Sequence, residues 1–352
     1  MVKKEKRTFL RFEQVVSALL DNSKPFSPTL LHRFSDISNE DLTELKAAWL
    51  NIDPNRRVAV LEDLEELAEA DSLVSFDDLA RFALQDPDAR ARAVAIRLLW
   101  ESDDRRLIPI FVRIMEKDDD EVVRASATAA LGMFIYIGEL ESIPTESLQY
   151  AEDHLLLVYQ SSDSPLVRRR ALESLGFSGR EDIPAIIRKS YQSDNKEWIA
   201  SALFAMGRSA DEMWEDSILG MLDHNEPDVQ IEAVRASGQL ELVSAREPLL
   251  AMLEEDDLLD EDVRAAAIWS LSQIGGPGVR EVLTQLSEES DDDDEADYIE
   301  MAIDNLSLAE GAVGFDFLGL NGLQKDELDT IIDVNDDEDD YDYKPLPPKK
   351  RK

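Results

Sequence analysis

A short pattern of apolar and polar positions recurs along most of the chain. Its clearest copy is Val-Arg-Ala-Ser-Ala-Thr-Ala-Ala-Leu-Gly at residues 123–132, which follows three aspartates at 118–120. Val123, Ala127 and Leu131 would share one face of a helix with about 3.6 residues per turn. An aspartate just before such a helix can accept hydrogen bonds from its first free N–H groups. The pattern therefore predicts capped, amphipathic helices.

Copies of this pattern return at a nearly regular spacing. Successive copies lie 31 to 44 residues apart, a period typical of arrays of stacked units. A second amphipathic stretch lies between copies, for example residues 107–115, where Pro109 falls in the first turn and is tolerated. Each unit would be a helix pair that buries its apolar face only by stacking on its neighbours. The positions equivalent to Arg124 are Arg57, Arg92, Arg168, Ile199, Gln230, Arg264 and Ile299.

The repeated pattern D-x-D-x-x-V-R-x-x-A-x-x-A-L-G resembles the HEAT-repeat family, and in particular the short bacterial HEAT-like repeats of phycobiliprotein lyases. The resemblance covers roughly residues 51–307. It implies an all-α fold, an α-solenoid of about eight HEAT-like helix pairs. In HEAT proteins the helix that begins Val-Arg usually lines the concave, ligand-facing side. Three replacements of the arginine, at Ile199, Gln230 and Ile299, would interrupt any ladder of Asp–Arg pairs between repeats.

Three regions follow from this organisation. Residues 1–50 are predicted to form an N-terminal helical cap, residues 51–308 the HEAT-like solenoid, and residues 309–352 an acidic, largely disordered tail with a basic end. The longest step between copies leaves about ten extra residues around 135–144, which form either a loop or a longer helix. The final Pro-Pro-Lys-Lys-Arg-Lys resembles a nuclear import signal, and it equally suits a basic end that folds back on the acidic run.

The charge of the chain narrows the range of partners. The formal net charge is −40. Such a field repels nucleic-acid phosphates and anionic lipid surfaces, and it attracts basic proteins or peptides. Nucleic-acid binding is therefore not expected, unless Arg168, Arg169 and Arg170 form a local basic strip. With no signal peptide and no apolar run long enough to cross a membrane, we expect a cytoplasmic protein.

The sequence offers little of what catalysis needs. It has no cysteine, which excludes disulfides, thiolate nucleophiles and cysteine-based zinc sites. The HEAT-like iron hydroxylases place His-Glu pairs on their repeats, but none of His32, His154 and His224 is followed by glutamate. No phosphate-binding loop, G-x-S-x-G elbow or H-E-x-x-H motif occurs. We therefore predict no catalytic residues, no metal site, no cofactor and no enzymatic activity.

The predicted function is that of a non-enzymatic scaffold or adaptor that binds a basic protein or peptide on the concave face. Residues two, six and nine positions after the Val position of each copy point away from the buried stripe. Tryptophan and arginine, which are enriched at binding hot spots, occupy several of them. These side chains would bind the partner, unless they pack against the next repeat. The alternative, from the resemblance, is a chaperone-like bilin lyase that holds a chromophore or a client protein. The candidate site residues are Arg97, Trp100, Arg169, Phe204, Arg235 and Trp269.

Overall fold

The computed structural model describes residues 11–255 and 259–317, and every element in these ranges is a helix. The predicted all-α fold is thereby confirmed for the described residues. None of their helices is long and apolar enough to cross a membrane. The chain divides into two compact units, residues 1–274 and residues 275–352.

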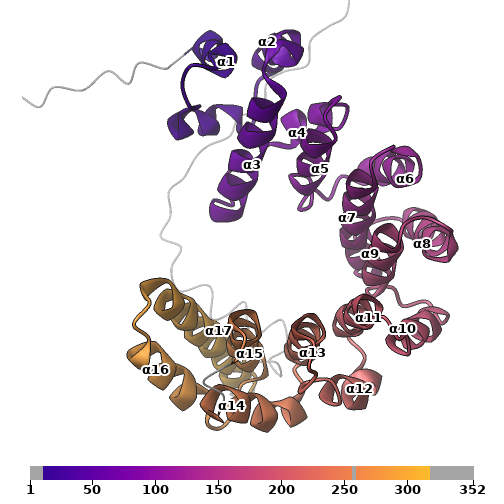
Figure 1. Cartoon of the computed structure of the whole chain (residues 1–352), viewed down its shortest axis with the longest axis vertical. Coiled ribbons are helices and arrows are strands. Elements are labelled where there is room, and N and C mark those ends of the chain that lie inside the picture. The colour runs from indigo at the N-terminus through magenta and orange to yellow at the C-terminus, as the bar shows by residue number, and fades with distance from the viewer. Residues whose placement is uncertain (1–10, 256–258, 318–352) are drawn as a thin grey trace, which may run out of the picture. The chain divides into compact units, whose positions relative to one another are not determined.

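The first unit holds fifteen of the described α-helices, drawn in Figure 1 from indigo to orange. Short 3₁₀ helices at Pro28–Phe34, Trp49–Asn51, Glu212–Trp214 and Val243–Ala245 lie between some of them. The α-helices are α1 (Phe12–Leu20), α2 (Asn39–Ala48), α3 (Pro54–Ala70), α4 (Asp77–Ala83), α5 (Ala89–Arg97), α6 (Leu107–Lys117), α7 (Glu121–Glu139), α8 (Thr145–Gln160), α9 (Pro165–Leu175), α10 (Ile183–Tyr191), α11 (Lys196–Arg208), α12 (Glu215–Leu219), α13 (Pro227–Gln239), α14 (Arg246–Glu255) and α15 (Glu261–Ile274).

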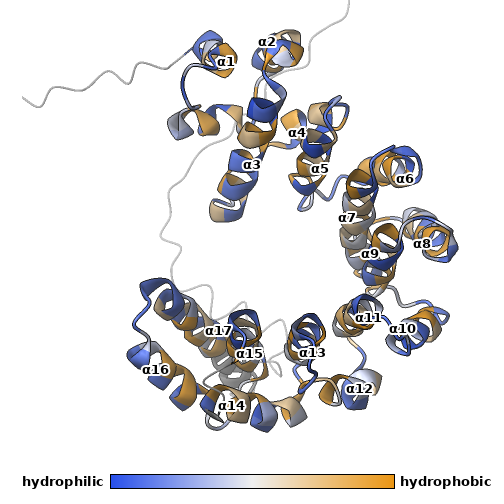
Figure 2. Cartoon of the chain, viewed as in Figure 1, coloured by the Kyte–Doolittle hydropathy of each residue, from blue (hydrophilic) through white to orange (hydrophobic). Residues whose placement is uncertain are grey.

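From α3 onward the helices of the first unit form two rows. Helices α3, α5, α7, α9, α11, α13 and α15 pack side by side, and we call them the odd row. Each helix of the even row, α4 to α14, packs against the odd-row helix that follows it. The odd row contains the helices that begin Val-Arg. Figure 2 shows apolar and polar stretches interleaved within the helices, as expected for helices that are each buried on one side.

Most odd-row helices begin where the sequence supplies a capping side chain, and α13, which follows Glu226, is an exception. Asp120 accepts hydrogen bonds from the backbone N–H groups of Val122 and Val123 at 2.8 and 3.2 Å. The side chains of Asp88, Ser164 and Asn195 cap α5, α9 and α11 in the same way. Because these acceptors satisfy N–H groups that have no partner within the helix, they fix where each helix starts.

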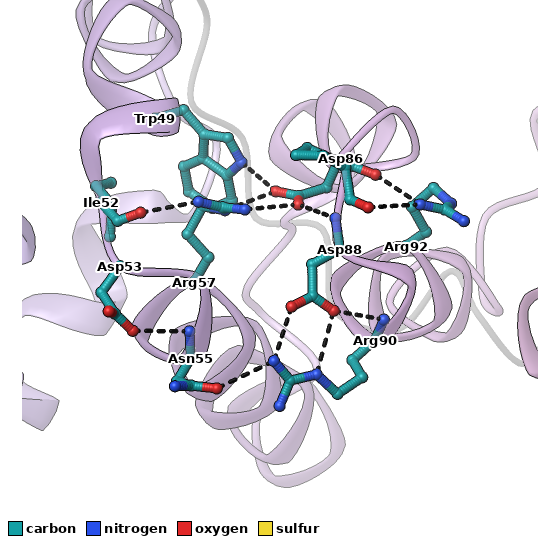
Figure 3. A network of polar contacts seen from close by, with 10 residues as sticks. Trp49, Ile52, Asp53, Asn55, Arg57, Asp86, Asp88, Arg90 and Arg92 are labelled. Atoms are coloured by element: carbon teal, nitrogen blue, oxygen red, sulfur yellow. Dashed lines mark hydrogen bonds and ion pairs between the residues drawn. The ribbon is translucent and has the colours of Figure 1, made fainter. Parts of the chain in front are cut away.

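A ladder of ion pairs joins successive odd-row helices at their N-terminal ends. Arg57 of α3 donates from Nε and Nη2 to both carboxylate oxygens of Asp86, at 2.8 and 2.9 Å (Figure 3). Trp49 Nε1 donates to the same carboxylate at 2.6 Å, and Arg57 is only 3% exposed. Equivalent bidentate pairs link Arg92 to Asp118 and Arg124 to Asp163.

The ladder changes character at α9. Arg168 donates to the backbone carbonyl of Tyr159 at 3.0 Å and stacks over the ring of Trp198, with its guanidinium carbon 5.3 Å from the ring centroid. In the next helices Ile199 replaces the arginine, and Gln230 donates to the carbonyl of Leu222 at 2.8 Å. The replacement of arginine by isoleucine predicted that the ladder of ion pairs would be interrupted at Ile199. The structure shows the interruption one helix earlier, because Arg168 stacks on Trp198.

The extra residues around 135–144 lengthen helices. Helix α7 has 19 residues and α8 has 16, and only a short turn separates them. Of the two alternatives left by the sequence, the longer helix is therefore right.

The second unit contributes one described helix pair, α16 (Val279–Glu289) and α17 (Asp293–Phe317). The two helices pack through the buried side chains Val279, Leu283, Ile299, Ala302 and Leu306. The expected end of the solenoid at residue 308 falls within α17. The acidic run at 336–340 and the basic end lie outside the described residues, so the interpretations given to them stay predictions.

Candidate protein-binding groove

Two adjoining cavities lie along the odd row of the first unit. The first, which we call the Trp100 cavity, has a volume of about 700 Å³ and is lined by residues of α3, α5, α7, α9 and α11 and of the segments after α5 and α9. The second, the Glu232 cavity, has a volume of about 580 Å³ and is lined mainly by α9, α11 and α13. Leu166 and Arg170 line both cavities. We call the two together the odd-row groove.

The surface of the Trp100 cavity is mostly apolar. Helix α7 contributes Ala125, Ala129 and Met133 at helical spacing. Trp100, in the turn that follows α5, is 51% exposed. Beside it Arg97 forms a bidentate pair with Glu65 at 2.6 and 2.7 Å, so its charge is matched within the protein. The cavity therefore offers an aromatic ring above a helix surface of small side chains.

Arg208 lies between two aromatic rings at the edge of the Trp100 cavity. Its guanidinium carbon is 4.1 Å from the ring centroid of Phe204 and 4.6 Å from that of Phe177. One nitrogen, Nη1, donates to the backbone carbonyl of Glu173 at 3.2 Å. Burial lowers the pKa of Arg208 to about 10, because a charged group loses solvation there. The arginine stays charged at neutral pH and holds the two rings in place.

The Glu232 cavity is lined by charged side chains. Arg169 pairs with Glu197 at 3.0 Å, and Arg235 pairs with Glu232 at 3.2 Å. Glu173 is 7% exposed and accepts hydrogen bonds from Ser201 Oγ and from Arg170, which lies on the same helix. Each of these charged side chains therefore has a partner of opposite charge, and Glu173, the buried one, has two hydrogen-bond donors, as is usual for a buried charge.

Two atoms of this cavity are exceptions. Oε2 of Glu232 and Nε of Arg169 are buried, and no hydrogen-bond partner reaches either of them within the described part of the chain. Burial raises the pKa of Glu232 above its usual value, and the nearby charge of Glu173 raises it further, while Arg235 and Arg170 act in the opposite direction. The cavity thus holds a carboxylate that is only half satisfied.

The repeat pattern and the two rows of helices agree with a comparison against protein-family models. Residues 76–156 and 215–303 match the model described as HEAT repeats. The chain is a HEAT-repeat protein. The finer resemblance to the repeats of phycobiliprotein lyases stays a prediction.

This HEAT-repeat protein is also similar to several solved structures. The Escherichia coli protein YibA is 17% identical, with 86% of this chain and 99% of that chain covered and a TM-score of 0.38. Importin beta is 14% identical, with 84% and 46% covered and a TM-score of 0.40. Human deoxyhypusine hydroxylase is 17% identical, with 84% and 96% covered and a TM-score of 0.34. A search of curated proteins gives no match.

The candidate site residues of this HEAT-repeat protein fall into two groups and one outlier. Arg97 and Trp100 line the Trp100 cavity, and Arg169, Phe204 and Arg235 line the Glu232 cavity. Trp269 lines neither of these cavities and is half-buried on α15. Five of the six candidate positions therefore line the odd-row groove, although Phe204 is half-buried by its stacking on Arg208, and their role in binding stays a prediction.

The sequence reasoning missed Glu232, Arg170 and Arg208. Glu232 and Arg170 each stand three positions after the Val of their helix, whereas only positions two, six and nine were considered. Position three is adjacent to position two and one turn before position six, so a wider search of the pattern would have found both. Arg208 follows the end of the repeat pattern, and only the three-dimensional packing of Phe177 and Phe204 brings it into the groove.

Two other kinds of site considered from the sequence, a metal site and a basic strip, do not form in the described part of the chain. Among the described residues, no three His, Asp or Glu side chains cluster as metal ligands. The possible basic strip at residues 168–170 does not form, because Arg168 stacks on Trp198, Arg169 pairs with Glu197, and Arg170 pairs with Glu173.

Proposed function

We propose that this HEAT-repeat protein is a non-enzymatic, cytoplasmic scaffold or adaptor that binds a basic protein or peptide along the odd-row groove, and that it does not bind nucleic acid. One observation carries the proposal: a groove of two adjoining cavities with exposed apolar side chains, Trp100 and Val122, runs along a row of repeat helices. Exposed apolar surface with a polar rim is typical of protein-binding sites.

The outward face of α7 supports this proposal. Val122, Ser126, Ala129 and Met133 follow one another at helical spacing along the Trp100 cavity, and none of them carries a charge. Small side chains leave room for a partner to approach the helix closely, and a tryptophan at the edge supplies large contact area. In a chain with 32% charged residues, four uncharged positions in a row on one helix face favour a binding surface over a solvated one.

The basic character of the partner follows from electrostatics. The net charge of −40 steers cationic partners toward the protein and slows the approach of anionic ones. Complementary charge mainly raises the association rate and the specificity, while apolar contacts in the groove supply affinity.

A pair of matched variants tests the proposal. Ala129→Arg puts a long, charged side chain into the Trp100 cavity, and Ala185→Arg makes the same change at an exposed position of α10 in the even row. Proteins retained from the lysate of the source cell are compared for the full-length wild type and both variants, after thermal unfolding has shown that all three are folded. We expect a discrete partner whose retention falls at least about tenfold with Ala129→Arg, a loss of roughly 1.4 kcal/mol, and is unchanged with Ala185→Arg. Equal retention by all three proteins would exclude the groove as the binding site.

A further inference from the structure

We propose that the Glu232 cavity receives a cationic side chain, an arginine or lysine, of the peptide segment that the groove binds. This inference rests on the proposed function and adds to it the chemistry of one contact. It follows from the balance of charge around the cavity, from the contacts of Glu232, and from the continuity of the two cavities.

Carboxylates outnumber cations around the Glu232 cavity. Each arginine that lines it already has a carboxylate partner, so the cavity keeps an excess of negative charge after internal pairing. Lys196 Nζ lies 3.9 Å from Asp228 and partly offsets that carboxylate, so a cation that enters would meet the charge of Asp262 and the buried Oε2 of Glu232. Arg208, the next arginine along the groove, lines the Trp100 cavity, and its charge interacts favourably with those of Glu173 and Glu232 without a hydrogen bond to either side chain. The acidic residues that line the Glu232 cavity are Glu173, Glu197, Asp228, Glu232 and Asp262, and the arginines are Arg169, Arg170 and Arg235.

Within the cavity, Glu232 is the carboxylate whose own contacts leave most of its charge unmatched. Its Oε2 is buried and accepts no hydrogen bond from the described residues, while Oε1 accepts only the 3.2 Å contact from Arg235. The Arg235 side chain is 53% exposed, and an exposed partner on the same helix contributes little to neutralising Glu232, whose side chain is 18% exposed. An N–H donor from outside would satisfy Oε2 and would bring a compensating charge. Arginine and lysine are the side chains that supply both.

The route into the cavity is also acidic. Asp228 and Asp262 are exposed residues at the beginnings of α13 and α15, and both line the cavity. They would attract a long cationic side chain before it meets Glu232. The side chains of Phe204, Ala200 and Ile231 form the apolar parts of the wall, against which the methylene groups of arginine or lysine can pack.

The rest of the ligand would lie along the odd row. Because Leu166 and Arg170 line both cavities, a segment whose cation reaches Glu232 continues into the Trp100 cavity. The apolar side chains there favour an aromatic or aliphatic residue. The expected ligand is therefore a short segment with one cationic and one apolar anchor.

Selection from a library of random peptides of about twelve residues, displayed on phage, tests this chemistry whatever the natural partner is. The full-length protein is the target, and the variants Glu232→Gln, Ala129→Arg and Ala185→Arg are compared with it. Glutamine keeps the size of glutamate and removes its charge. We expect the selected peptides to be enriched in arginine or lysine together with an apolar residue, and to bind Glu232→Gln at least tenfold more weakly than the wild type.

The possible outcomes distinguish a failure of the cationic contact from a failure of the proposed binding function. Peptides that lose binding with Ala129→Arg but bind Glu232→Gln as well as the wild type would support the groove and overturn the cationic contact. Selected peptides without basic residues would overturn it too. Peptides that bind Ala129→Arg and Ala185→Arg equally, or a library that yields no binder, would count against the groove itself.

A double-variant comparison then assigns the contact. The cationic arginine of the best peptide is replaced by citrulline, which keeps its shape and loses its charge. If the arginine meets Glu232, the replacement weakens binding to the wild type at least tenfold and changes binding to Glu232→Gln by less than threefold, because the partner charge is already gone. Equal losses with both proteins would show that the arginine binds elsewhere.

Discussion

At the scale of single residues, the charged groups of this protein divide into those whose partners are internal and those whose partners are incomplete. Arg57 and Asp86 satisfy each other and a tryptophan, although both are buried. Glu232 has one oxygen without a donor among the described residues and only an exposed arginine on the other. A half-satisfied carboxylate lowers the stability of the folded state, which is a common property of binding sites.

Glu232→Gln should therefore stabilise the unliganded protein in a pH-dependent way. The folded pKa of Glu232 is raised above its usual value of 4.5, so between that pH and the raised pKa the folded state binds more protons than the unfolded one. The carboxylate thus costs no stability at low pH and costs most above its folded pKa. We expect the difference in Tm between variant and wild type to grow as pH rises from about 4 to about 8. Glu197→Gln, which removes an exposed carboxylate of the same cavity that is paired with Arg169, is the matched control for the loss of a charge. A constant difference for Glu232→Gln would contradict the assignment.

The outward direction of a candidate residue could be predicted from sequence where it depends on one helix, but not where it depends on two, and the role of these residues in binding stays a prediction. The outward direction of Arg169, Phe204 and Arg235 follows from helical periodicity alone, and all three line one cavity. The placement of Arg208 between Phe177 and Phe204 depends on contacts between α11 and a residue in the segment after α9. Nothing in the local pattern specifies such contacts.

At the scale of helices, the repeat pattern predicted both the units and their close packing. Its final glycine shows why. A Cβ atom added at Gly176 would lie 2.8 Å from the Cα atom of Ala205 on α11, which is closer than real Cβ atoms come. The pattern Ala-Leu-Gly thus marks places where neighbouring odd-row helices approach each other. The interruption of the ladder was harder to predict, because it depends on the ring of Trp198 and not on the loss of an arginine.

The first step of the ladder should contribute strongly to stability. Asp86→Ala leaves the guanidinium of Arg57 and the indole N–H of Trp49 buried without their acceptor. Loss of one partner of a buried ion pair costs about 3–5 kcal/mol, which thermal or urea unfolding would detect readily. Lys196→Ala is the control, because its 2.6 Å pair with Glu226 is exposed to solvent and an exposed pair contributes little to stability. Similar effects of the two variants would mean that the ladder is not a major source of stability.

At the scale of the whole molecule, the sequence established more about architecture than about function. The repeat length, the apolar stripes and the capping residues together predicted an array of helix pairs, and the described helices agree with it. The division at residue 274 was not apparent, because the repeat pattern continues across it into α17. Partner identity depends on the surface of the groove, where substitutions change binding without changing the repeat.

The place where the ladder of ion pairs ends has a consequence for how the array opens. In a linear array each unit is stabilised by its neighbours, so the strength of each junction decides how far local unfolding spreads. Opening that starts in α11–α15 meets its first bidentate pair at the Arg124–Asp163 junction of α7 and α9. We expect slower amide hydrogen exchange in α5 and α7 than in α11 and α13, with a step at α9, and exchange measured on the intact chain would reveal it. A uniform profile would contradict this order. If the step is present, the odd-row groove spans a more stable part of the array and a less stable part. A partner that binds both parts would then stabilise the weaker one, and it would slow exchange most in α11 and α13.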